Sequence, residues 1–383
     1  MFIPLPRLGE RNSITSRCFL AVIGLLTAAA LGYIYADSLV FLFGQWGWDD
    51  YSHGPFIPFI SAFLIWQRRT QLVVVGISPS WAGTVLVAIG LMLFILGDYA
   101  TLYVLLHLSL WVVVVGITLS FIGWPALRVL AFPLSYLLTA IPLPIFLYNT
   151  LSSQLQLWSS ALGVGFLQAI GVTAFREGNV IDLGPVQLQV AEACSGIRYL
   201  FPLASLALLC AYLYRDRLWK RIVLVVSALP VSIFVNGLRI GIVGVLVEWY
   251  GPRAAEGFLH LFEGWVLFLA TLGLLLLEMW VLSNVHPLLG STRLSERFSW
   301  DIVRESEESA AVTSGMSPRT QPRFPAYAGN LALILPVALL FPSIGERQEI
   351  IPERAAFMDF SMRIGKWQGN PQPVEPQLID RKS

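Results

Sequence analysis

The chain is poor in charged residues. Only 13% of its 383 residues are Asp, Glu, Lys or Arg, about half the share of a typical soluble domain, whereas 56% are hydrophobic. The formal net charge of +1 gives no basis for binding to nucleic acid. This composition excludes an ordinary soluble enzyme and indicates that most of the chain is spent on membrane-spanning helices.

Cysteine and histidine are also scarce. The chain has three cysteines and four histidines, with no CxxC pair and no HExxH motif. These absences argue against a zinc ribbon, a redox dithiol and a metalloprotease of the HExxH type. Cys18 and Cys210 fall near or within apolar runs, where a thiol usually packs as a small hydrophobic group. Cys194 differs from both, because Glu192 and Arg198 flank it at the end of a polar stretch.

Asp49, Asp50 and His53 form a polar cluster that could in principle bind a metal together with His260. Their spacing matches no strong metal motif, so we expect no metal at this cluster. The alternative is a loop that caps a cavity, held at the membrane interface by its tryptophan and tyrosine side chains.

Nine apolar runs can be compared with the ~20 residues that a helix needs to cross the hydrocarbon core. They cover residues 18–43, 54–66, 81–97, 101–122, 128–148, 196–214, 222–249, 264–283 and 326–343. We therefore predict an all-α polytopic membrane protein with about nine transmembrane helices.

Basic residues in the loops between these runs all fall on one side if every run crosses the membrane. The positive-inside rule assigns that side to the cytoplasm. The basic residues are Arg7, Arg11, Arg17, Arg68, Arg69, Arg128, Arg215, Arg217, Lys220, Arg221, Arg293, Arg297, Arg304, Arg319 and Arg323. The loops that hold Cys194, His260 and the polar cluster then face the outside.

The resulting domain organisation has five parts. They are a cytoplasmic N-terminus (1–17), a transmembrane domain (18–285), a cytoplasmic linker rich in Ser, Glu, Pro and Arg (286–325), a final transmembrane helix (326–343) and a soluble outer segment (344–383).

Two elements are predicted in the outer loop that precedes Cys194. Residues 151–171 are apolar with polar interruptions, which indicates an amphipathic helix on the outer membrane surface. Residues 180–183 and 186–190 are separated by turn residues, and the second of these segments alternates apolar and polar side chains, which predicts a small hairpin. The hairpin would deliver Cys194 to the next helix.

Cys194 lies where this polar stretch ends and the sixth apolar run begins. A cysteine reacts as its thiolate, and its unperturbed pKa is about 8.5. The positive end of a helix, Arg198 at i+4 and the imidazole of His260 could each favour the thiolate. Gly196 would leave room for a substrate backbone. An inert cysteine at the membrane interface is the alternative.

Arg239 lies inside the seventh apolar run. A charged side chain in a span costs about 2.5–3.5 kcal/mol, so it usually serves a site or a buried partner. We predict that Pro230, Asn236 and Gly237 break the helix and let the guanidinium reach an outer cavity, where it could hold an oxyanion, a substrate carboxylate or the thiolate. The alternative is a structural ion pair with one of three carboxylates: Asp98, Glu248 or Glu263.

His260 is the candidate general acid–base, because imidazole titrates near neutral pH. It lies on the same predicted side as Cys194, and Glu263 follows at i+3, where it could orient the ring.

Together these residues resemble the exosortases, over roughly residues 15–285. The matching segments are Tyr51–Pro55 with Trp66–Arg69, then Cys194–Tyr199, Asn236–Arg239, and His260 ahead of Glu263–Trp265. The segment 360–369 is similar to the opening of the exosortase-associated periplasmic domain. That similarity points to the fused subfamily that serves VPLPA-type sorting signals, with the associated domain expected to be truncated here.

The resemblance implies a cysteine transpeptidase of a Gram-negative inner membrane, with no cofactor and an active site that faces the periplasm. Its substrates would be exported proteins whose C-terminal signal has a short proline-containing motif, an apolar helix and a basic end, in sorting linked to exopolysaccharide. Cys194 would form a thioester and His260 would serve as acid and base toward an unidentified acceptor. Arg239 would stabilise the oxyanion or position the thiolate. The supporting residues would be His53, Gly196, Arg198, Asn236 and Glu263.

A rival hypothesis is a polytopic transporter or a component of exopolysaccharide export, in which Arg239 lines a substrate path. Such proteins often show paired broken helices in two repeated halves, and no internal repeat is evident here.

Overall fold

The computed structural model describes residues 22–184, 186–190, 196–214, 216–251, 265–285, 325–345 and 363–369. The chain divides into two compact units, residues 1–339 and 340–383. Three of the predicted site residues, Cys194, His260 and Glu263, lie outside the described residues, as do the predicted N-terminal segment 1–17 and nearly all of the linker 286–325.

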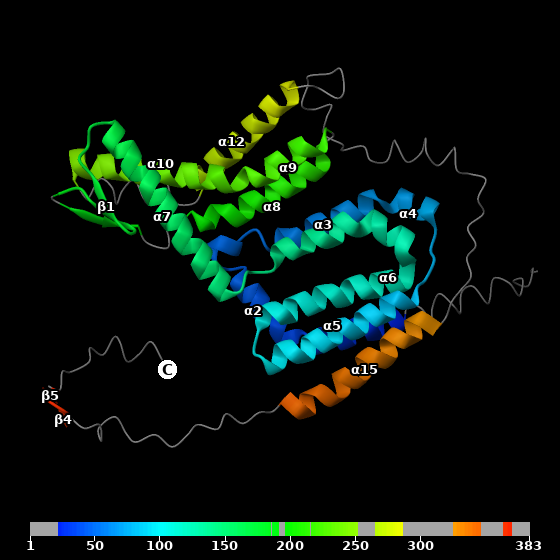
Figure 1. The fold of residues 1–383 in the computed structure, drawn as a ribbon. Helices are drawn as coiled ribbons and strands as arrows, with labels where there is room; N and C mark the ends of the chain where they lie inside the picture. The colour runs from blue at the N-terminus through cyan, green and yellow to red at the C-terminus, as the bar shows by residue number, and fades with distance from the viewer. Residues whose placement is uncertain are drawn as a thin grey trace, which may run out of the picture. The chain divides into compact units, whose positions relative to one another are not determined.

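Helices make up most of the described chain (Figure 1). They are Val22–Ile34, α2 (Ala36–Gln45), α3 (Phe56–Gln67), α4 (Arg69–Val75), α5 (Trp81–Tyr99), α6 (Tyr103–Tyr136), α7 (Ile145–Ala169), α8 (Ile197–Leu213), α9 (Leu218–Val226), α10 (Ala228–Tyr250), α12 (Trp265–Asn284) and α15 (Pro325–Gly345), with 3₁₀ turns η1 (Asp49–Tyr51) and η2 (Leu137–Ala140).

Three helical segments among the described residues are long and apolar enough to cross a membrane: Trp81–Tyr99, Tyr103–Ala140 and Leu218–Tyr250. A fourth is added if Val22–Ile34 and α2, which meet at an angle of 66°, form one bent span. Shorter apolar helices cover Ile197–Leu213, Phe268–Asn284 and Ala328–Leu340. An all-α membrane protein is thus confirmed, and the count of nine spans stays a prediction.

Helix α6 folds back on itself at Gly123. This residue has φ 79° and ψ 178°, a conformation open to glycine alone, and a Cβ there would collide with the carbonyl oxygen of Ser78. The Trp111 indole donates to the Leu134 carbonyl at 2.7 Å, so the two arms of α6 are antiparallel neighbours. They match the predicted runs 101–122 and 128–148, which were expected as separate helices.

The second arm ends earlier than predicted. Its last turn is η2, which closes at Ala140 rather than at residue 148. Pro142 and Pro144 follow, and proline disfavours helical backbone in the residue before it while lacking an N–H of its own. The chain then starts a new helix, α7, at Ile145.

The predicted surface helix is α7, and its environment corrects the prediction. The helix packs along α10 (Figure 1), and Ser152, Ser159 and Ser160 on its small, polar face are buried. A Cβ at Gly163 would overlap Ile240 of α10. Small residues let two helix backbones approach closely in a membrane. The buried serines therefore serve helix packing, whereas Ser153, Gln154 and Gln168 of the same helix are exposed.

Helix α10 corrects a second prediction. It runs unbroken from Ala228 to Tyr250, through Asn236 and Gly237, and its junction with α9 lies earlier, at Ser227. Pro230 stands in the first turn, where a missing N–H costs no helical hydrogen bond. A Cβ at Gly237 would overlap Leu162, so this glycine is needed for the contact with α7 rather than for a break.

The predicted hairpin is confirmed and has one more strand than expected. Strands β1 (Phe175–Glu177), β2 (Val180–Asp182) and β3 (Gln187–Gln189) form an antiparallel sheet in the order β1-β2-β3. The register pairs Arg176 with Ile181 and Ile181 with Leu188.

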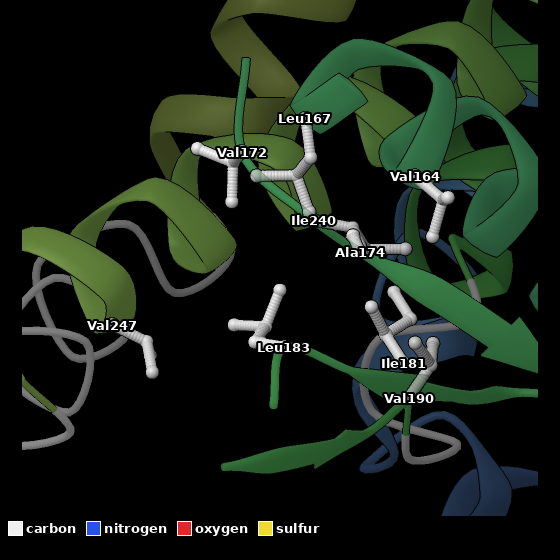
Figure 2. Close-up of a cluster of buried hydrophobic side chains, with 9 residues drawn as sticks. All are labelled: Val164, Leu167, Val172, Ala174, Ile181, Leu183, Val190, Ile240 and Val247. Atoms are coloured by element: carbon white, nitrogen blue, oxygen red, sulfur yellow. The ribbon is translucent and has the colours of Figure 1, made fainter. Parts of the chain in front are cut away.

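This sheet has its own apolar core against α7 and α10, which Figure 2 shows. The buried side chains are Val164, Leu167, Val172, Ala174, Ile181, Leu183, Val190, Ile240 and Val247. The sheet is therefore anchored to the two helices.

In the second unit the described residues form a two-stranded hairpin, β4 (Arg363–Ile364) and β5 (Trp367–Gln368), with Gly365 at φ 61° in the turn.

Candidate active site

The start of α8 is fastened to the middle of α10. Gly196 is the residue before the helix and has φ 80°, which favours glycine. Its carbonyl accepts a hydrogen bond from Ser232 at 3.1 Å, and a Cβ on it would lie 3.2 Å from the Cβ of Asn236. The sequence predicted that Gly196 leaves room for a substrate backbone. Its positive φ and its contact with Asn236 also favour glycine at this position for structural reasons.

Helices α8 and α10 run antiparallel from this contact. Tyr199 packs with Val235 and Val231, and further along α8 Ala207 shares a core with Ala228. Arg239 lies three residues beyond Asn236, about 4.5 Å further along α10 and on a similar face. The chain that precedes Gly196 thus leaves α8 at the end of the contact nearest Arg239.

Arg239 is 5% exposed, and two of its guanidinium nitrogens, Nε and Nη1, are buried without a hydrogen-bond partner in the described part of the chain. Its side chain lines a cavity of about 460 Å³ between α10 and α12, together with Ala270, Gly273 and Leu274. Within the described residues it forms no ion pair with Asp98 or Glu248. A structural ion pair with either carboxylate is therefore not supported.

The loop before α3 is tied to the first turns of α8. Arg198 Nη1 lies 3.2 Å from Asp49 Oδ2 in a partly exposed ion pair. The Tyr51 ring stacks on Phe201 with a centroid distance of 5.1 Å. Arg198, predicted to act on Cys194, is thus engaged with the loop.

The same loop is held from its other side by the junction between η2 and α7. Trp46 donates to the Ala140 carbonyl at 2.9 Å, and the Leu143 N–H donates to the Tyr51 hydroxyl at 3.1 Å. The Tyr148 hydroxyl donates to Asp50 at 2.6 Å. These contacts agree with the capping interpretation of the loop. No group of three or more potential metal ligands gathers in the part of the chain that the structure describes.

His53 lies at the end of this loop. Its Nε2 is 3.2 Å from the Thr139 carbonyl, which can only accept, so Nε2 carries the proton and Nδ1 holds the lone pair. Nδ1 is buried and has no hydrogen-bond partner within the described ranges. Burial lowers the pKa of His53, and the hydrogen bond to Thr139 opposes this only in part. The imidazole is therefore neutral at neutral pH.

The structure brings two predicted site residues, Gly196 and Asn236, together where α8 begins. Arg198 lies in the first turn of α8 and pairs with Asp49, and Arg239 follows Asn236 by three residues on α10. His53 belongs to the loop that Arg198 fastens. Sequence reasoning missed Ser232, although its spacing of four residues from Asn236 placed it on the same helix face. It also missed Asp49 as an ionic partner, because that contact joins residues far apart in the chain.

Comparison with known proteins bears on the family to which the chain belongs. Searches of curated proteins and of solved structures gave no significant match. A family model described as transmembrane exosortase matches residues 46–277, more than half of the chain and the whole span from the capping loop to α12. The chain therefore belongs to the transmembrane exosortase family, whose members are membrane-embedded cysteine transpeptidases that process sorting signals.

Proposed function

We propose that the protein cleaves the C-terminal sorting signals of exported proteins through a thioester on Cys194 and transfers the product to an acceptor nucleophile. The observation that carries this proposal is the buried guanidinium of Arg239, two of whose nitrogens have no hydrogen-bond partner among the described residues. A cation in a membrane interior is costly, and unmade hydrogen bonds add to the cost. Such a group is expected where negative charge develops during a reaction.

Covalent geometry supports a meeting of Cys194 with Arg239. Position 194 is two residues before Gly196, and two residues of chain span at most about 7 Å. Gly196 contacts Asn236, one turn of α10 from Arg239. A thiolate at position 194 would thus be within reach of the guanidinium.

The reaction then has two acyl transfers. The Cys194 thiolate attacks the peptide carbonyl, the oxyanion is stabilised by Arg239, and the C–N bond breaks as His260 protonates the leaving amine. His260 next removes a proton from the acceptor nucleophile, which attacks the thioester and releases the thiolate. Glu263 would orient His260. Asn236 and the capping loop with His53 would shape the site.

The finer topology belongs to the same proposal. Nine spans and an inside N-terminus would place the site on the periplasmic side of the inner membrane, with 18–285 as catalytic domain, 286–325 as linker, 326–343 as last span and 344–383 as the start of a VPLPA-type associated domain. Reporters fused after residues 50, 180 and 255 should lie outside, and those fused after 70, 218 and 305 inside. A cytoplasmic reporter at 180 would contradict this arrangement.

The decisive experiment follows a tagged exported reporter that ends in a VPLPA-type motif, an apolar helix and a basic tail, co-expressed with each variant. Cys194→Ser should abolish the size shift, because a hydroxyl is a poor nucleophile at neutral pH. Cys210→Ala is the matched control and should process normally, since Cys210 packs inside α8 with the core of α9 and α12. Chains cut after about residue 345 should also process, because every proposed catalytic residue precedes that point.

Full processing by Cys194→Ser would exclude the thiol mechanism. The unbroken course of α10 through Arg239 already counts against the transporter hypothesis.

A further inference from the structure

We infer that the free edge of β3 is the docking strand for the substrate, where the extended segment of a sorting signal adds as a fourth strand before it reaches Cys194. The inference rests on the proposed function and names how that site would recognise its substrate. Its support comes from the backbone of the sheet.

The hydrogen bonds of the sheet fix which groups of β3 are free. The Val186 carbonyl accepts from Leu183, and the Val190 N–H donates to Asn179, so both residues turn their backbone groups toward β2. In an antiparallel pair this orientation alternates along the strand. Gln187 and Gln189 therefore direct their N–H and carbonyl groups away from β2. Among the described residues, no backbone hydrogen bond satisfies them.

The sheet holds this edge on a rigid base. Leu188 packs on the apolar core formed with α7 and α10. Gln187 Nε2 donates to Asp182 at 3.3 Å, and Asn179 Nδ2 donates to the Val190 carbonyl at 3.1 Å. An added peptide would meet a preformed template rather than a segment that must first order.

The two edges of the sheet differ in chemistry. The opposite edge strand, β1, carries Arg176 and Glu177, and charged side chains on an edge discourage pairing with another chain. Strand β3 reads Gln-Leu-Gln and has neither charge nor proline. Only β3 therefore has an edge suited to strand addition.

The position of β3 in the chain selects the occupant. Cys194 follows Val190 by four residues, a reach of at most about 14 Å, and a neighbouring strand would lie about 4.8 Å from β3. A peptide paired with β3 would thus extend toward the nucleophile. A proline-containing motif suits this role because proline and the residue before it favour extended backbone. Main-chain pairing supplies affinity in other strand-addition complexes.

Proline scanning tests the edge. Gln187→Pro and Gln189→Pro each remove one outward N–H and leave the bonds to β2 intact. Each should slow processing of the VPLPA-type reporter about 2- to 12-fold, the value of one hydrogen bond, and the double variant should slow it further. Gln187→Ala, which keeps the N–H, should lose clearly less than Gln187→Pro.

Arg176→Pro is the matched control. Its register with Ile181 places the Arg176 backbone groups on the outward side of β1, so this proline also removes a free N–H from an edge of the same sheet. Processing should stay unchanged. Equal losses in Arg176→Pro and Gln187→Pro would overturn the inference, because they would reflect damage to the sheet as a whole.

Photocrosslinking separates docking from chemistry. The Cys194→Ala protein, with Gln187 replaced by photoreactive p-benzoylphenylalanine, should form an adduct with the uncleaved reporter. The same replacement at Arg176 should form none. Failure to capture the reporter from position 187, or an adduct with a second copy of the chain in its place, would refute docking on β3. Loss of processing in Cys194→Ser tests the proposed function independently of this result.

Discussion

Replacing Arg239 with methionine should stabilise the protein while it abolishes processing. Methionine fills a similar volume in the cavity between α10 and α12 and carries no charge. Two guanidinium nitrogens are buried without partners among the residues that the structure describes, and each such group costs about 1–3 kcal/mol. Some favourable packing of the side chain is lost in exchange, so we expect a net gain of about 2–4 kcal/mol in the free energy of unfolding.

That gain corresponds to a rise in Tm of roughly 3–5 °C for a chain of 383 residues. The measurement is thermal unfolding of the detergent-purified protein, followed by tryptophan fluorescence, beside the processing of the tagged reporter in cells. Arg128→Met is the matched control, because Arg128 is exposed on the second arm of α6. Its stability should change by less than about 0.5 kcal/mol and its processing should be normal.

The sign of the stability change discriminates between the two roles of Arg239. If the arginine were half of a buried ion pair, removing it would cost about 3–5 kcal/mol because the partner charge would remain buried. A fall in Tm by several degrees, or normal processing by Arg239→Met, would refute the functional role argued above.

Two further predictions concern parts of the fold away from the site. Lys220→Met should cost about 3–5 kcal/mol, because Lys220 Nζ and Asp216 Oδ2 form a fully enclosed ion pair at 2.7 Å. Burial raises the pKa of Asp216, but hydrogen bonds from Lys220, Arg217 and Tyr214 outweigh it and hold the pKa below its ordinary value. In the unmodified protein, the stabilisation by this ion pair is therefore present above about pH 4 and is lost as the pH falls through the depressed pKa of Asp216. In Lys220→Met, the free energy of unfolding should instead decrease as the pH rises. Unfolding curves across acidic pH check this, and an unchanged pH profile would contradict it. Gly123→Ala should cost at least about 2 kcal/mol because of its backbone conformation and the collision with Ser78, whereas Gly24→Ala, with open space around it, should be neutral in the same thermal assay.

Much of the fold follows from local pattern in the sequence. Long apolar runs predict membrane helices wherever they occur, and α5 lies close to its predicted bounds. Turn residues between two short segments, the second with period two, predicted the β2–β3 hairpin, because side-chain alternation and turn chemistry are local properties. The motifs around Gly196, Asn236 and Arg239 likewise marked the helices that meet at the candidate site.

The incorrect predictions concern small residues, because the role of a small residue depends on which part of the folded chain packs against it. Gly237 could break a helix or admit a close neighbour, and only the position of α7 shows that it does the second. Ser152, Ser159 and Ser160 of α7 could face water or another helix, and all three are buried. The same limit applies to the pairing of Arg198 with Asp49, which joins residues 149 positions apart in sequence.

The sequence by itself determined the membrane class, the hairpin and the family motifs, since each rests on composition, periodicity or residue identity over short distances. Only the tertiary structure decided that Arg239 has no carboxylate partner among the described residues, and that β3 leaves one edge unpaired. Both are statements about which groups lack a neighbour. A neighbour can come from any part of the chain, so its absence becomes visible only when the folded chain is assembled.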